Sequence, residues 1–528
     1  MLTTKEKESR KQIRYVCIED LVPQNHLLRR VENAVNFEFV REEVRDLYSE
    51  DKGRPSVDPV TLVKLCVINY MYGYNSMRRT IRECEVNAAY RWFIGYDLTE
   101  AVPHFTTFGK NYKRRFEGTD IFERIFMRVL NTAIEKGLVD TNTVYIDGTH
   151  IKANANTHKN FKKQVALEAK AYQKLLVKEI DADREEHGKK PLKDDDNDGG
   201  TPKTKEITVS KSDPASGLFH KGEHKKCFAY NAQTACDKNG WVLAATVDPG
   251  NKHDSALLKK IYQKVKKNVG KPENAVLDAG YKTPYVAKLL IDDGVDPYMP
   301  YTRPYTKKGF FFKNEYVYDE YYDCCLCPEN QVLEYSTTNR EGYREYKSDP
   351  EVCRNCSVRG QCTLSANCQK AVTRHIWHEY LEAVEDNRYT RRGRELYGRR
   401  KETIERVFAD AKEKHGMRFT RVNGLAKVKT QVLLTFMTMN LKKLAKLIGG
   451  DTLVFPLFRG LFSVSPQSFR FLKPKYFKTM QKALRKIAKC LLSAVWREVL
   501  CYFSTIPPVS HMCVNLGFDR KRLEFIKR

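Results

Sequence analysis

The sequence predicts an α/β protein with a helical N-terminal region. Apolar residues recur at helical spacing over residues 1–136, and short apolar runs alternate with amphipathic stretches after them. Two of these runs end directly before an aspartate: VYI precedes Asp147, and AVL precedes Asp278. We expect short buried strands that each present a carboxylate at its end, with helices between them.

Composition favours a polyanionic partner. The chain has 528 residues with 93 Lys and Arg against 66 Asp and Glu, a net charge of +27. Nucleic acid is the first candidate for such a basic chain, and a membrane surface is the second. No apolar run is long enough to span a bilayer, and the N-terminus does not resemble a secretory signal. The 15 cysteines, an odd number without such a signal, indicate a reducing compartment.

The N-terminal region, 1–136, reads as packed helices. Residues 60–116 carry apolar positions at helical spacing, and a helix start at 103–108 leads into a basic cluster of Lys110, Lys113, Arg114 and Arg115. Residues 121–136 form a further helix that ends at Gly137. Two interpretations remain open: a DNA-end-binding domain, or a helical accessory domain.

The region 137–448 is expected to form one α/β domain with two insertions. Residues 158–215 are polar, with a helical run at 161–180 and a flexible stretch at 189–211. Strands at 227–235 and 241–247 are joined by an Asn-Gly turn, which predicts a hairpin. A helix at 255–265, with Asp254 as its cap, then leads to the strand before Asp278.

Asp147 and Asp278 share one context, because each follows a short apolar run. Asp147 alone suits a turn before Gly148. Adjacent parallel strands, however, would bring the two carboxylates together at one sheet edge, where sites form in open α/β sheets. Since a carboxylate at the end of a buried strand needs a partner, a divalent cation with oxygen ligands is a natural one.

A third carboxylate, Glu405, stands on a basic helix that ends at Gly416. Its apolar face is formed by Ile404, Val407, Phe408 and Ala411. Extending the helical period places Glu405 half-buried at the edge of that face, with Lys401 and Lys412 on the same side. A plain surface ion pair explains Glu405 by itself. Beside Asp147 and Asp278, a metal-binding acid with two phosphate-contacting lysines is the better interpretation.

These stretches resemble a bacterial insertion-sequence transposase of the Asp-Asp-Glu class. The three acids lie in YIDGTHIKAN, VLDAGY and TIERVFADAK, and Lys412 follows Glu405 by the seven residues that this mobile-element family expects. The family also expects an Arg four residues before the Glu and a Tyr three residues before that Arg. Here Lys401 stands at the Arg position, and Tyr397 is one place out of register. The resemblance covers about residues 10–445, including RWF and PHFTTF in the helical region and the closing stretch 422–444.

The resemblance implies an RNase H-like catalytic domain, in which helices flank a mixed sheet. It implies DNA transposition: metal-dependent hydrolysis at element ends, then strand transfer into target DNA. Asp147, Asp278 and Glu405 would hold two Mg²⁺ or Mn²⁺ ions, which serve both sides of a phosphodiester displacement. Lys412, Lys401 and Arg400 would contact DNA phosphates. We expect double-stranded DNA as the partner, a homodimer that joins two ends, no membrane partner, and a bacterial cytoplasmic location at the nucleoid.

A cysteine-rich insertion, 310–370, precedes Glu405. It holds two CxxC pairs, Cys324 with Cys327 and Cys353 with Cys356, for which tetrahedral structural zinc is our expectation. Cys362 is a substitute ligand, and reduced cysteines without metal are the alternative. Such a site would hold a small insertion together without a large core.

The C-terminal tail, 449–528, is basic, and 480–503 predicts an amphipathic helix that docks, contacts DNA, or forms a solvated surface. Two other functions stay open for the whole chain. One is a metal-dependent nuclease of the same fold that does not transpose. The other is a zinc-containing DNA-binding regulator without catalysis, whose DNA binding would survive loss of all three acids.

Overall fold

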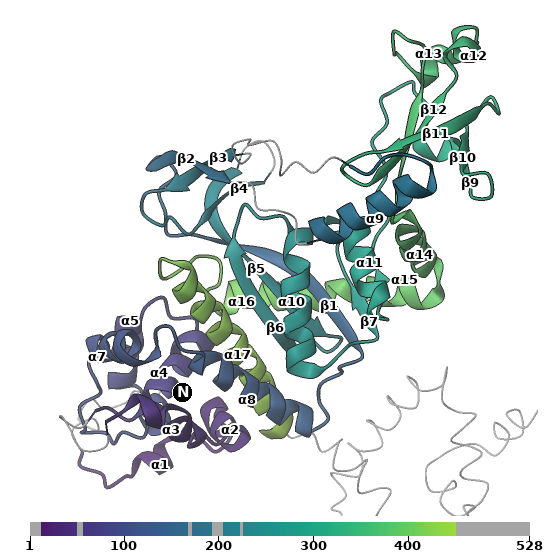
Figure 1. Ribbon diagram of the computed structural model, residues 1–528. Coiled ribbons are helices and arrows are strands. Elements are labelled where there is room, and N and C mark those ends of the chain that lie inside the picture. The colour runs from purple at the N-terminus through teal and green to yellow at the C-terminus, as the bar shows by residue number, and fades with distance from the viewer. Residues whose placement is uncertain (1–11, 50–55, 167–171, 193–203, 222–224, 450–528) are drawn as a thin grey trace, which may run out of the picture. The chain divides into compact units, whose positions relative to one another are not determined.

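The computed structural model describes residues 12–49, 56–166, 172–192, 204–221 and 225–449 (Figure 1). The chain divides into two compact units, 1–450 and 451–528. The second unit, including the helix expected at 480–503, lies outside the described residues. In the described part, no helix combines the length and apolar character needed to cross a bilayer.

The N-terminal region is helical, as the apolar spacing predicts. Its longest helices, α4 and α8, both pack against α3 and against the C-terminal helix α17 (Leu425–Gly449). Thr80 and Asn69 bond inside this core, where a polar pair is tolerated because each partner satisfies the other. The helices are α1 (Ile18–Leu21), α2 (Leu27–Ala34), α3 (Phe39–Val44), α4 (Pro59–Met71), α5 (Met77–Val86), α6 (Ala88–Ile94), α7 (Phe105–Asn111) and α8 (Ile121–Glu135).

A mixed sheet follows α8. β1 pairs with β5 in antiparallel register, and β5 in turn pairs with β4 and β6. On its other edge β1 runs parallel to β7, and β7 parallel to β8. The hairpin predicted at the Asn-Gly turn is therefore confirmed. The strands are β1 (Thr143–Lys152), β4 (Gly217–Lys221), β5 (Lys225–Asp237), β6 (Val242–Pro249), β7 (Asn274–Val276) and β8 (Asp296–Tyr298).

Helices cover both faces of this sheet. All but the last residue of β6 are buried, so β6 is covered on both faces. The helices that contact it are α10 (Asp254–Val269) and α17 (Figure 1). α11 (Pro284–Asp292) and α14 (His378–Tyr389) contact β8 near the parallel edge.

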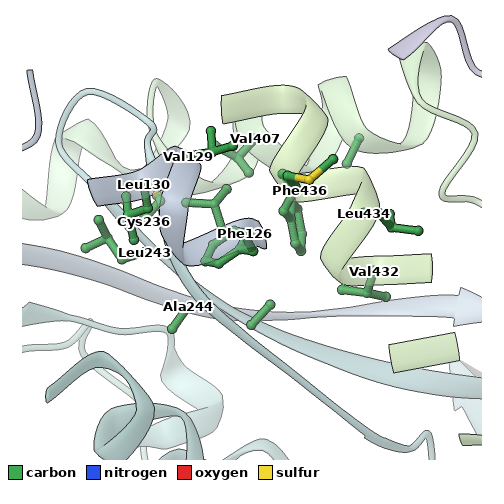
Figure 2. Packing of buried hydrophobic residues seen from close by; sticks show 14 of the residues in the cluster. Phe126, Val129, Leu130, Cys236, Leu243, Ala244, Val407, Val432, Leu434 and Phe436 are labelled. Atoms are coloured by element: carbon green, nitrogen blue, oxygen red, sulfur yellow. The ribbon is translucent and has the colours of Figure 1, made fainter. Parts of the chain in front are cut away.

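One core joins the helical region to the sheet (Figure 2). α17 contacts α2, α4 and α8 as well as β6, so its sides are buried against both parts. Figure 2 shows side chains of α8, β5, β6, α16 (Ile404–Lys414) and α17 meeting in this core: Phe126, Val129, Leu130, Cys236, Leu243, Ala244, Val407, Val432, Leu434 and Phe436.

The polar insertion differs from its prediction. The helical run expected at 161–180 is wrong at its start, because β2 (Asn160–Ala166) pairs with β3 (Thr204–Ser210) and the helix α9 begins only at Gln173 and ends at Glu186. In NFKKQVA the apolar Phe161 and Val165 stand four residues apart among Lys and Gln, a spacing that suits a helix as well as a strand, so the pairing with β3 decides it. Residues 167–171 and 193–203 lie outside the described part.

The cysteine-rich insertion forms its own five-stranded antiparallel sheet, in the order β13, β12, β11, β10, β9. α9 contacts β11, and Arg344 on β12 forms an ion pair with Asp183 of α9. The elements are β9 (Val317–Asp319), β10 (Cys324–Leu326), β11 (Val332–Thr338), β12 (Tyr343–Ser348), α12 (Pro350–Arg354), α13 (Arg359–Cys362) and β13 (Ala371–His375).

Candidate active site

Asp147 and Asp278 lie on neighbouring parallel strands, as their matching contexts predict. β1 and β7 pair through Tyr145 and Val276, which places the two aspartates just beyond the last paired residues. Asp278 follows β7 after Leu277, at the strand end that the sequence predicts. Asp147 differs, because β1 continues to Lys152 and places Asp147 inside the strand. Antiparallel pairing with β5 extends β1 beyond its apolar run.

A single arginine bridges the two aspartates. Arg400 Nη2 lies 2.7 Å from Asp147 Oδ2, and Arg400 Nη1 lies 2.9 Å from Asp278 Oδ1. The Arg400 side chain is only 6% exposed, against 18% for Asp147 and 51% for Asp278. The Arg400 bridge therefore joins two carboxylates that are far apart in sequence.

Burial governs the charge of this cluster. Burial raises the pKa of Asp147 to about 6, although the Arg400 guanidinium and the Gly148 N–H, which donates to Asp147 Oδ1 at 2.8 Å, oppose the rise. Burial also disfavours the charge of Arg400, but Asp147 and Asp278 raise its pKa overall. Arg400 Nε is buried without a hydrogen-bond partner among the described residues. The guanidinium is thus held by its two aspartates more than by the rest of the fold.

Arg400 follows α15 (Arg391–Gly398) in a short 3₁₀ turn, Arg399–Lys401, before α16 begins at Ile404. This turn changes the expected helical wheel, because residues 401 and 405 are not on one continuous helix. Glu405 is exposed, not half-buried as the wheel predicted, and Lys401 is also exposed. Lys412, two turns further along α16, is half-buried.

The same turn accounts for the register of Tyr397. Tyr397 precedes Arg400 by three residues, and its hydroxyl lies 3.4 Å from Arg400 Nη1. The Tyr–Arg spacing of the resemblance is therefore kept, and the pair as a whole lies one residue further from Glu405. The sequence already contained this signal in the Tyr397-x-x-Arg400 spacing. From the sequence alone, Lys401 is placed at the Arg position of the family, and Arg400 is given a DNA contact only.

A second polar cluster lies behind Gly148. Asn231 Nδ2 and Gln233 Nε2, both on β5, donate to Asp254 Oδ1 at 2.8 and 2.7 Å. A Cβ at Gly148 would come within 2.5 Å of Gln233 Nε2 and 2.7 Å of Asp254 Oδ1. Asp254 was expected to cap α10, but His253 is the cap, and its ring accepts from Ser255 N. The cap pattern gave no sign that Asp254 reaches back to the sheet.

Carboxylates are suitable ligands for Mg²⁺ or Mn²⁺. Asp147 and Asp278 already share one cation between them, and Glu405 lies on α16, which contacts β1. Within the described residues, however, no three acidic, His or Cys side chains converge closely enough to hold a metal ion. The donor chemistry fits a divalent metal, while the Arg400 guanidinium contacts the oxygens that such a metal would use.

The positions of the cysteines do not support the expected zinc site. Cys324 and Cys325 are buried on β10, whereas Cys353 and Cys356 lie in and after α12. Cys353 Sγ donates to Ser348 Oγ at 3.2 Å. Across the parts of the chain that are described, Cys324, Cys327, Cys353 and Cys356 do not form a metal cluster. CxxC spacing alone does not determine whether four thiols meet, because the strand β10 turns neighbouring cysteines to opposite faces.

The fold and the paired carboxylates define the class first: an α/β protein with a mixed sheet, in which acids from two neighbouring parallel strands bind one arginine. Two protein families then match the chain. Residues 16–114 match a transposase domain (DUF772), and residues 326–445 match a transposase DDE domain. These two regions therefore resemble domains of DDE-type transposases, and a DDE domain implies an RNase H-like fold. Neither curated proteins nor solved structures give a match.

These matches indicate a coarse function. A transposase DDE domain implies phosphoryl transfer on DNA and binding of DNA. The DDE match begins at Leu326 and contains Arg400, Glu405 and Lys412, but neither Asp147 nor Asp278. The roles of the individual acids therefore rest on the geometry.

Proposed function

We propose that this protein cleaves the ends of an insertion element and transfers them into target DNA, with Asp147, Asp278 and Glu405 as the catalytic acids. The observation that carries the proposal is the convergence of Asp147 and Asp278, from separate strands, on the single Arg400 guanidinium. Two buried or half-exposed acids beside a cation form a pre-arranged site for a phosphate and its metal.

A divalent metal bound by the three acids would activate the attacking oxygen and stabilise the leaving oxygen of a phosphodiester. Asp147 and Asp278 are held by β1 and β7, so their positions are fixed by the sheet. Glu405 is exposed on α16, a helix that contacts β1. In this proposal Arg400 withdraws from at least one aspartate and contacts a DNA phosphate, for which a forked guanidinium is well suited.

Lys412 and Lys401 would contact phosphates beside Glu405, and the N-terminal domain would bind the element end. Lys110, Lys113 and Arg114 are exposed beside α7 and support that assignment. Two ends must be joined in transposition, so we propose that the protein acts as a homodimer on DNA. Bacterial cytoplasm, at the nucleoid, is the compartment that this activity requires.

The test uses the DNA that flanks this reading frame, incubated with the full-length protein and Mg²⁺ or Mn²⁺. Asp278→Ala is expected to lower end cleavage by about three orders of magnitude or more, because loss of one ligand disrupts the metal that serves both oxygens. Binding of the same DNA should stay near that of the wild type. Asp386→Ala, which removes an exposed carboxylate of α14, is the matched control and should cleave normally.

Each result separates the alternatives. Retained cleavage by Asp278→Ala would contradict the assignment of the acids. Cleavage that does not depend on the flanking ends would favour a nuclease over a transposase. Binding without any cleavage by the wild type in either metal would favour a regulator.

A further inference from the structure

The cavity beside α16 carries an excess of positive charge. It has a volume of 340 Å³ and lies between α16, α17 and the turn that joins β5 to β6. Lys442, Lys443 and Lys446 come from one face of α17, where residues three and four apart are neighbours. Arg406 and Lys414 come from α16. Only two carboxylates, Glu402 and Asp410, line the same cavity.

Most of this charge is not neutralised within the described residues. Lys414 forms an ion pair with Asp410 at 2.6 Å. Lys443 donates to the Asn239 carbonyl and lies 4.9 Å from the centre of the Trp241 ring. No ion pair or hydrogen bond joins the side chains of Lys442, Lys446 or Arg406 to another described residue. The fold therefore holds three cations at this cavity without giving them a partner.

The lysines repel one another. Burial lowers the pKa of Lys442, and Lys446 and Lys414 lower it further. Burial also lowers the pKa of Lys443, with Arg406 acting in the same direction. His415, at the base of the cavity, is buried, and burial lowers its pKa so that it adds no charge at neutral pH. Like charges kept together at a cost to the fold are typical of an anion-binding surface.

The position of the cavity relative to Glu405 suggests which anion binds. Arg406 and Asp410 stand four residues apart on the cavity side of α16, and Glu402 lies just before the helix. Glu405 directly precedes Arg406, about 100° around the same helix. A phosphate chain that passes Glu405 can therefore reach Arg406 and continue along α17. A polymer with a charge on each unit suits such a row better than a small anion does.

We propose that this lysine groove, formed by Arg406, Lys414, Lys442, Lys443 and Lys446, binds the phosphate backbone of DNA next to the catalytic acids. This inference rests on the proposed function, because it extends the DNA path from Glu405. The C-terminal residues 451–528 are an unsuitable occupant, since they carry 15 Lys and Arg against 4 Asp and Glu. The groove is distinct from the N-terminal domain, so its contacts do not depend on the end sequence.

The experiment measures binding of a 5′-labelled duplex of arbitrary sequence by fluorescence anisotropy over a range of KCl concentrations. The full-length variant Lys442→Gln/Lys443→Gln/Lys446→Gln should bind at least tenfold more weakly at low salt. Its slope of log Kd against log[KCl] should fall by about 2 to 3, since each lost phosphate contact contributes about 0.9. Lys174→Gln/Lys178→Gln/Lys267→Gln removes the same charge from exposed positions of α9 and α10 and should change the slope by less than about 1.

Two further measurements keep the result interpretable. The groove variant should melt at the same temperature as the wild type or higher, because it relieves repulsion, so weaker binding cannot be attributed to unfolding. Lys442→Arg/Lys446→Arg keeps the charge and should keep the salt slope. An equal slope for the groove variant and the surface control would overturn the proposal. Tighter binding of a polyglutamate peptide than of the duplex, at equal charge, would also overturn it by indicating an acidic protein segment as the occupant.

Failure here is distinct from failure of the proposed function. If the groove does not bind DNA, the salt slopes agree while Asp278→Ala still abolishes cleavage. If the acids are wrongly assigned, Asp278→Ala cleaves normally whatever the salt slopes are.

Discussion

At the residue scale, Arg400 determines the state of the site. Its guanidinium bonds to Asp147 and Asp278, and its Nε lacks a partner among the described residues. Removing one partner from a buried ion pair leaves an uncompensated charge, which costs about 3–5 kcal/mol when burial is complete. Because Asp278 is half-exposed, a smaller cost is expected here. A divalent metal can replace the guanidinium as the compensating charge.

We therefore predict that Arg400→Gln lowers the free energy of unfolding by about 1–3 kcal/mol in the absence of metal. Mn²⁺ should restore much of that loss at pH 8, which is above the pKa of Asp147, and should stabilise the wild type much less. Thermal unfolding with and without Mn²⁺ measures both effects. Lys401→Gln, an exposed neighbour, is the control. Equal stabilisation of wild type and Arg400→Gln by Mn²⁺ would mean that Arg400 does not compete with metal.

A second prediction concerns pH. The folded-state pKa of Asp147, about 6, is raised above its ordinary value of 3.8. The stability that this group contributes is therefore full below pH 4 and is lost as pH rises through 6. Metal binding requires the ionised form, so cleavage should increase with pH through about 6. Rates measured from pH 5 to 8 at two Mn²⁺ concentrations test this, because more metal should move the rise to lower pH. A rise that ignores Mn²⁺ would assign it to another group.

At the scale of the element, β1 is the strand that both clusters share. Asp147 pairs in register with Thr234, and Gly148 with Gln233, so successive residues of β1 serve opposite faces. The Arg400 bridge lies on one face, and the group of Asn231, Gln233 and Asp254 is packed closely behind Gly148. A side chain at position 148 would displace that group and move β1 with it.

Gly148→Ala is accordingly expected to destabilise the protein by about 1–3 kcal/mol, as overpacking does, and to impair cleavage by shifting Asp147. Gly360→Ala on α13 is a suitable control, because its Cβ would meet nothing within 4 Å. Urea unfolding and end cleavage measure the two effects. Normal stability together with normal cleavage for Gly148→Ala would show that the strand can accommodate the methyl group.

At the scale of the whole molecule, α17 holds the helical region and the sheet together. It contacts α2, α4 and α8 on the one part and β6 on the other. The loop before it adds polar links: Arg421 Nη1 donates to Asn69 Oδ1 at 2.5 Å, and the His415 ring bonds to the Tyr70 carbonyl at 2.8 Å. The two transposase domains therefore share one core within residues 1–450 and are expected to unfold together.

Phe436→Ala tests that coupling, since Phe436 is fully buried in the shared core (Figure 2). We predict a loss of about 3–5 kcal/mol. Hydrogen exchange should speed up in α4 and α8 as well as in β6. Phe93→Ala, buried within the N-terminal helices, is the comparison. Faster exchange confined to one of the two parts in Phe436→Ala would mean that they unfold independently.

The sequence by itself determined much of this protein. Short apolar runs before Asp147 and Asp278 predicted two buried strands that each carry an acid, because an apolar run of that length suits a buried strand. The Asn-Gly hairpin and most helices followed from turn chemistry and apolar period. The polar insertion was read less well, since a strand rich in Lys and Gln lacks the apolar alternation that marks one.

Only the tertiary structure decided which groups meet. Local spacing placed Glu405 and Lys401 on one helical face, but the 3₁₀ turn at Arg399–Lys401 separates them and directs Arg400 between the two acids. Likewise the two CxxC pairs gave no information on whether their four thiols converge, because one pair lies at strand β10 and the other at helix α12, and only packing sets how these elements meet. The lysine groove is formed by residues of two helices, α16 and α17, beside a hairpin turn from a distant part of the chain. The periodicity of one segment does not reveal a surface that several segments share. Contacts between segments far apart in the chain depend on packing, which local residue patterns do not specify.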